Sequence, residues 1–103
     1  MTVKGKLLDE IKEIARRNKA LSNPFRVLVL AVIKSKGTAS WYELKEIIEK
    51  FVGQVNPNTL AFHLNKLVEV GLVVRAGPER APRYEARGVP EDVIKISKKL
   101  KTL

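Results

Sequence analysis

The sequence predicts a mainly α-helical domain of the α+β class, with one small β-hairpin. Over most of the chain, apolar residues recur with a period of about 3.6, as they do on one face of a helix. After Gly71 the period falls to about two, which is typical of short strands. With 103 residues, of which 45% are hydrophobic and 30% charged, the chain fits one folded domain over residues 1–103.

Two amphipathic helices are predicted near the ends of the chain, over residues 6–19 and 90–101. The second has acidic residues in its first turn and lysines later, which matches the helix dipole. Each helix has one apolar stripe on an otherwise polar surface, and nothing inside its own segment covers that stripe. The two stripes contain Leu7, Ile11, Ile14, Val93, Ile96 and Leu100.

A third helix, over residues 23–36, is apolar almost all round, so it is predicted to lie at the centre of the core. Asn23 is a suitable N-cap, and Pro24 is tolerated at the first helical position. Gly37 is expected to end this helix.

Two further helices, over residues 40–51 and 57–70, follow one another as a helix-turn-helix pair does. Ser40 and Glu43 have the spacing of a capping box at the start of the first. Residues 72–87 then form two short strands around a loop that contains glycine and proline. This order predicts a winged helix-turn-helix, flanked by N- and C-terminal amphipathic helices, in which the hairpin is the wing.

Composition narrows the classes of partner. The formal net charge is +9 and the pI is near 10.0, which favours a polyanionic partner. The longest apolar run, Val27–Ile33, is too short to span a bilayer, and the first residues lack the apolar core of a signal peptide. We therefore expect a soluble, cytoplasmic protein without a membrane partner.

The residue inventory argues against catalysis and cofactors. The chain has no cysteine, which excludes disulfides and thiolate metal sites. It also has no Ser-His-acid arrangement and no phosphate-binding glycine loop, so neither an enzyme nor a cofactor is expected. The single histidine, His63, borders the apolar face between Leu60 and Leu67. We expect it to be a hydrogen-bonded structural residue, because zinc sites need three or four ligands.

The helix over residues 57–70 is predicted to enter the major groove of double-stranded DNA, as the second helix of such a pair does. An Asn side chain can pair bidentately with adenine, and Thr or an apolar group can contact a thymine methyl. Phe62 stands on a polar face, where it would pack either on a thymine methyl or on a partner chain. The candidate base contacts are Asn58, Thr59, Phe62 and Asn65.

Affinity for DNA must come mainly from neighbouring elements, because residues 56–71 contain only one basic and one acidic residue. Phosphate contacts give affinity and register, whereas base-edge contacts give sequence preference. Arg80 lies near the tip of the predicted wing, where it could reach a minor groove. The candidate backbone and wing contacts are Ser40, Lys45, Lys66, Arg75, Arg80 and Arg83.

Residues 58–73 (NTLAFHLNKLVEVGLV) and 21–30 (LSNPFRVLVL) resemble the ArsR-like winged helix-turn-helix transcription regulators of prokaryotes, and archaeal winged-helix regulators share part of the pattern. The resemblance covers most of residues 21–88, and its most specific part is the H-L-x-x-L…G-L-V core. It implies a homodimer that is formed through its outer helices and that binds a pseudo-palindromic operator. In this chain that interface would be formed by the two stripes named above.

The sequence departs from this family at two places. Tyr42-Glu43-Leu44 stands where metal-sensing members carry Cys-x-Cys, so metal sensing is not expected, and an effector ligand is left open. Ala61 and Phe62 replace the family's usual Ser and Arg. A second hypothesis is a protein-interaction module of the transcription machinery, which docks through the Phe62 face.

Overall fold

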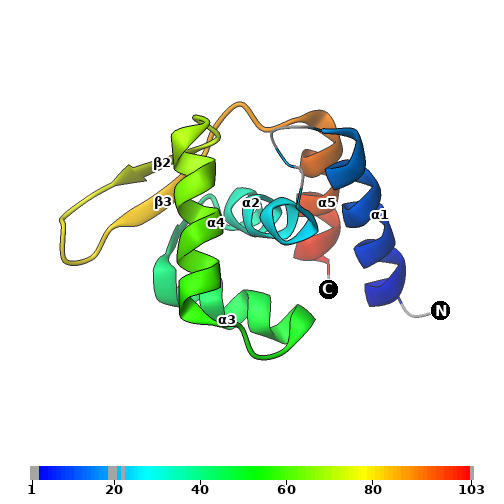
Figure 1. The fold of residues 1–103 in the computed structure, drawn as a ribbon, viewed down its shortest axis with the longest axis horizontal. Helices are drawn as coiled ribbons and strands as arrows, with labels where there is room; N and C mark the ends of the chain where they lie inside the picture. Colours follow the sequence, from blue (N-terminus) through cyan, green and yellow to red (C-terminus); the bar gives the residue numbers. More distant parts are fainter. Residues whose placement is uncertain (1–2, 19–20, 22, 103) are drawn as a thin grey trace.

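The computed structural model describes residues 3–18, 21 and 23–102, and shows five helices and three strands there (Figure 1). In chain order these are α1 (Val3–Arg17), α2 (Pro24–Lys36), β1 (Thr38–Ser40), α3 (Trp41–Val52), α4 (Pro57–Glu69), β2 (Val73–Ala76), β3 (Arg83–Ala86) and α5 (Glu91–Lys101). The predicted fold class, mainly helical with a small antiparallel sheet, is confirmed. The last residue of the predicted helix over residues 6–19 lies outside the described residues.

Helix α2 lies at the centre of the molecule, as its apolar sequence predicts. Seven consecutive residues, Val27–Ile33, are each at most 2% exposed. The side chain of Asn23 accepts a hydrogen bond from the Phe25 N–H at 2.8 Å and so caps the start of the helix. Gly37 ends it with a φ of +84°, a left-handed conformation that costs glycine little. The first and last turns of the helix are therefore fixed by local chemistry.

The sheet has one strand more than the sequence predicts. All three strands are antiparallel, in the order β1-β3-β2, so β3 is central. Strand β1 pairs Ala39 with Tyr84, and both side chains are buried. A strand of three residues shows no clear period of two, and its partner lies far along the chain, so local patterning does not reveal it.

The predicted capping box is present at the start of α3. The Ser40 hydroxyl accepts from the Glu43 N–H at 3.2 Å, and the Glu43 carboxylate accepts from the Ser40 N–H at 3.0 Å. The turn into α4 is fixed by Glu49, whose carboxylate accepts from the Val55 N–H at 2.9 Å. The chain therefore enters α4 from a defined direction, with the α4 core face on α2.

The element order from α2 to β3, helix-strand-helix-helix-strand-strand, is compatible with a winged helix. The β2–β3 hairpin extends past α4 on the side away from α1 and α5 (Figure 1). One end of the molecule thus presents α4 and the hairpin, and the opposite end presents α1 and α5.

The apolar stripes of the two outer helices are covered by the chain itself. The side chains of Leu7, Ile11, Ile14, Val93 and Ile96 are at most 5% exposed, and Leu100 is half-buried. Helices α1 and α5 contact each other and α2, so their stripes complete the chain's own core. A Lys99–Glu10 ion pair of 2.6 Å joins their outer surfaces. Side chains enclosed in this way offer almost no surface to a second copy in this structure, and the homodimer stays a prediction.

We predict that Ile96→Ala lowers the free energy of unfolding by about 2–5 kcal/mol, because the change leaves a cavity in a packed core. The loss should be the same at low and high protein concentration in a denaturant titration. Leu100→Ala, at a half-buried position of the same helix, should cost less. If the loss caused by Ile96→Ala shrinks on dilution, the residue belongs to an intermolecular contact, because such a contact stabilises the fold only when copies associate.

Candidate nucleic-acid interface

Helix α4 presents a polar stripe to solvent along its length. Asn58, Thr59 and Asn65 are exposed, and Phe62 between them is 53% exposed. Positions three and four residues apart lie on one side of a helix, so these side chains form a continuous strip. The opposite side of the helix is packed into the core through Leu60, Leu64 and Leu67. The structure therefore brings together the four residues that the sequence singles out for base contacts.

Phe62 is held in place by its neighbours on α4. Its ring meets the His63 ring edge-to-face, with 5.2 Å between the centroids. The ammonium group of Lys66 lies 5.5 Å from the Phe62 centroid, within range of a cation–π interaction. Lys66 also forms an ion pair of 3.2 Å with Glu69. An aromatic ring and a cation thus stand side by side on the exposed strip.

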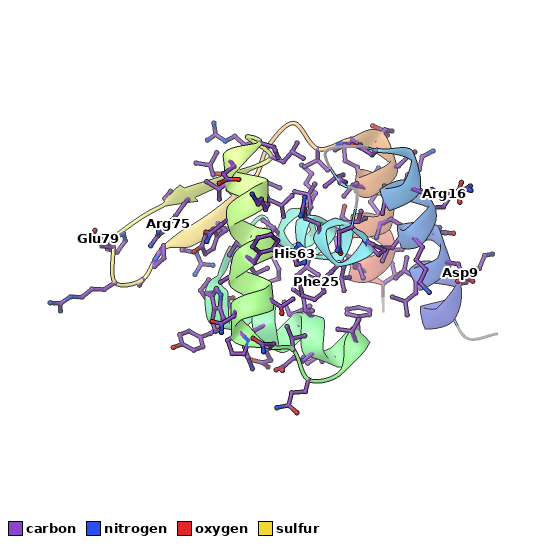
Figure 2. The ribbon with its side chains drawn as sticks, in the orientation of Figure 1. Asp9, Arg16, Phe25, His63, Arg75 and Glu79 are labelled. Atoms are coloured by element: carbon purple, nitrogen blue, oxygen red, sulfur yellow. The ribbon has the colours of Figure 1, made fainter. Side chains whose placement is uncertain are left out.

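His63 connects α4 to the start of α2. Its Nδ1 atom accepts a hydrogen bond from the Arg26 Nε–H at 3.2 Å, and its ring lies 5.3 Å from that of Phe25 (Figure 2). The side chain is buried. Burial, and then the Arg26 charge, lower the pKa of His63 below its ordinary value. These contacts confirm that His63 is a hydrogen-bonded structural residue.

The hairpin carries two exposed arginines, Arg75 on β2 and Arg80 in the loop. Neither forms an ion pair or a hydrogen bond with any described residue. Figure 2 shows Glu79 at the outer end of the hairpin and Arg75 between that end and α4. Both guanidinium groups are therefore available to an external anion.

Arg83, by contrast, is engaged within the molecule. Its Nη2 atom lies 3.1 Å from a Glu43 carboxylate oxygen, and its Nε–H donates to the Thr38 hydroxyl at 3.1 Å. Hydrogen bonds from Ser40, and then the Arg83 charge, lower the pKa of Glu43. Arg83 therefore ties β3 to β1 and to the first turn of α3, and about half of its side chain is left exposed.

Lys45 and Ser40 also have partners inside the chain. Lys45 forms an ion pair of 3.0 Å with Glu49, and Ser40 is the N-cap of α3. The pKa of Glu49 is lowered by the hydrogen bond from Val55 and then by Lys45. Among the predicted backbone and wing contacts, only Arg75 and Arg80 have no partner among the described residues. The other four, Ser40, Lys45, Lys66 and Arg83, each interact with a neighbouring side chain or backbone group.

An exposed aromatic residue beside this region was not among the sequence candidates. Tyr42 is 78% exposed in the first turn of α3, and its ring packs against that of Trp41 with 5.3 Å between the centroids. The register pairs Ser40 with Arg83, which places this turn beside the last paired residues before the hairpin loop. The adjacent Trp41-Tyr42 within the capping box was the available signal, since a solvated first turn rarely needs two aromatic rings.

Comparison with models of protein families, with curated proteins and with solved structures finds no significant match to this chain. Within residues 3–18, 21 and 23–102, no helix has the length and apolar character needed to cross a bilayer. Nor do these residues contain a cluster of three or more His, Asp or Glu side chains that could hold a metal ion.

The buried imidazole gives a prediction for pH. Because the chain has one histidine, an NMR titration of its ring is unambiguous, and its midpoint should lie below about 6.5. The folded state then binds this proton less tightly than the unfolded state. The contribution to stability is therefore complete above about pH 6.5 and is lost as the pH falls through the lowered pKa.

Arg26→Met should raise the His63 midpoint toward its ordinary value without reaching it, because burial remains as the larger cause. Arg75→Met removes the same charge from the hairpin and should leave the midpoint unchanged. A midpoint above 6.5 in the unaltered protein would refute the assigned environment of His63.

Proposed function

We propose that this chain binds double-stranded DNA through α4 and the β2–β3 hairpin, and acts as a sequence-specific transcription regulator of the ArsR-like type. The observation that carries the proposal is the exposed strip of Asn58, Phe62 and Asn65 on a helix beside a hairpin with two free arginines. The net charge of +9 suits a polyanionic partner.

Base recognition is assigned to α4. Its 13 residues span about 20 Å, and a helix of ordinary diameter fits the major groove of B-DNA. Asn58 and Asn65 lie about two turns apart on one face, so each can reach a different base edge, where the Asn amide pairs with adenine. Phe62, between them, would contact a thymine methyl and exclude water.

Phosphate contacts are assigned to Arg75 and Arg80, with Lys66 at the edge of the strip. Because α4 has one acidic and one basic side chain, it adds little attraction of its own. The hairpin would therefore supply much of the affinity and the register, and α4 the preference among sequences.

A homodimer on a pseudo-palindromic site is part of the proposal, and it rests on the family resemblance. Its interface must lie outside the five enclosed side chains of α1 and α5. The exposed surfaces of those helices lie at the opposite end of the molecule from the hairpin, so a dimer formed there would leave both DNA-binding faces free (Figure 1).

A second candidate function, docking on a protein of the transcription machinery, is favoured by two exposed apolar side chains. Phe62 is 53% and Val70 is 51% exposed, and the helix that carries Phe62 has no net charge. Such an interface would not need the free arginines of the hairpin. Affinity for duplex DNA and its dependence on salt separate the two functions.

We predict that the double variant Arg75→Gln/Arg80→Gln binds all duplexes more weakly. If each arginine neutralises one phosphate, the slope of log K against log salt should become shallower by about 1.8. The matched control is Lys98→Gln/Lys101→Gln, which removes two exposed charges from α5 and should leave the slope nearly unchanged. Equal slopes for both variants would show that the hairpin does not contact phosphate.

We predict that Asn58→Ala and Asn65→Ala mainly reduce discrimination among sequences. After selection of a preferred site from randomised duplexes, each variant should lose about 1–3 kcal/mol of preference for that site over one with a single changed base pair. Affinity for unrelated duplexes should change little. An equal loss on every duplex would assign these residues to the DNA backbone instead.

A further inference from the structure

An apolar pocket of about 290 Å³ opens at the surface between α1, the start of α2 and the end of α3. Its walls are almost entirely hydrocarbon, and its principal lining residues are Leu8, Ile11, Phe25, Leu28 and Val52. Val52 is 43% exposed, and Leu8 and Phe25 are half-buried, so apolar surface faces solvent here. The volume is close to the lower end of the range for small-molecule sites.

The pocket has one charged residue, Lys12, at its edge. The Lys12 side chain is exposed and has no ion pair or hydrogen bond within the part of the chain that the structure describes. Its ammonium group is therefore free to pair with an anion, while its methylene groups extend the apolar wall. One cation beside a hydrocarbon surface matches an amphipathic anion in both charge and polarity.

We propose that this pocket binds a small apolar monocarboxylate, such as a medium-chain fatty acid or an aryl acid. The hydrocarbon part of the ligand packs on Leu8, Phe25 and Val52, and its carboxylate pairs with Lys12. A neutral ligand of the same shape would lose only the ion pair. A dicarboxylate would have to place its second charge against hydrocarbon, which is costly.

The pocket is connected to the exposed strip of α4 by a short chain of contacts. Phe25 forms part of the pocket wall, its ring lies 5.3 Å from that of His63, and the His63 ring lies 5.2 Å from that of Phe62. Arg26, next to Phe25, donates the hydrogen bond to His63. A ligand that moves the Phe25 ring would therefore change the packing of Phe62, and through it the affinity for DNA. Only this last consequence rests on the proposed function.

Binding is tested first without DNA, by NMR titration of the isotope-labelled full chain with octanoate, phenylacetate and octanol. The amides of residues 8, 12, 25, 28 and 52 and the His63 ring should shift with each carboxylate. Lys12→Gln should weaken octanoate about three- to fivefold, as expected for an exposed ion pair, and leave octanol unchanged. Lys98→Gln, the same charge change on α5, should alter neither affinity.

The proposal is overturned if these amides do not shift at millimolar octanoate, or if the Lys12→Gln variant and the unaltered protein bind octanoate with equal affinity. Shifts of the same amides with protein concentration alone would also overturn it, because they would show a second copy of the chain on this face. A second titration, with duplex DNA present, should show octanoate changing DNA affinity. Since the first arm contains no DNA, the ligand site can be established even if the protein proves not to bind duplexes.

Discussion

The structure depends on the complete enclosure of α2. No stretch of seven consecutive apolar residues can be buried by one neighbour, since successive side chains of a helix point in all directions. Helices α1, α3, α4 and α5 and the strands β1 and β3 accordingly pack around it. Helices α1 and α5 are therefore part of the core. Their apolar stripes cover the side of α2 that α3, α4 and the sheet leave open.

This constraint also determines which surface is left for function. With its apolar side held on α2, α4 can only present Asn58, Phe62 and Asn65 outward. The polar joint between the two helices is the Arg26–His63 hydrogen bond, and the Arg83–Glu43 ion pair ties the hairpin to α3. Arg75 and Arg80 on the hairpin, by contrast, form no ion pair or hydrogen bond with any described residue. The exposed polar strip of α4 and the free cations of the hairpin are thus both attached to the same core.

Many of these features can be predicted from the sequence, because they depend on residues that are close together in the chain. Asn23 and Pro24 mark the start of α2, and Ser40 with Glu43 marks that of α3; the structure confirms both. The exposure of the α4 strip follows from helical periodicity. Two features cannot be predicted locally, because each depends on a partner far along the chain. One is strand β1, which pairs with β3, and the other is the surface that covers the stripes of the outer helices. An apolar stripe predicts burial, but it does not say whether the same chain or a second one covers it.

The proposed DNA-binding face is tested most directly by mapping the contact of a palindromic duplex on the protein through NMR chemical shifts at low salt. The shifts should concentrate on the outward side of α4, on the first turn of α3 and on the hairpin, and the amides of α2 should change little. Shifts confined to α1 and α5, or none with any duplex at low salt, would show that this face does not bind DNA.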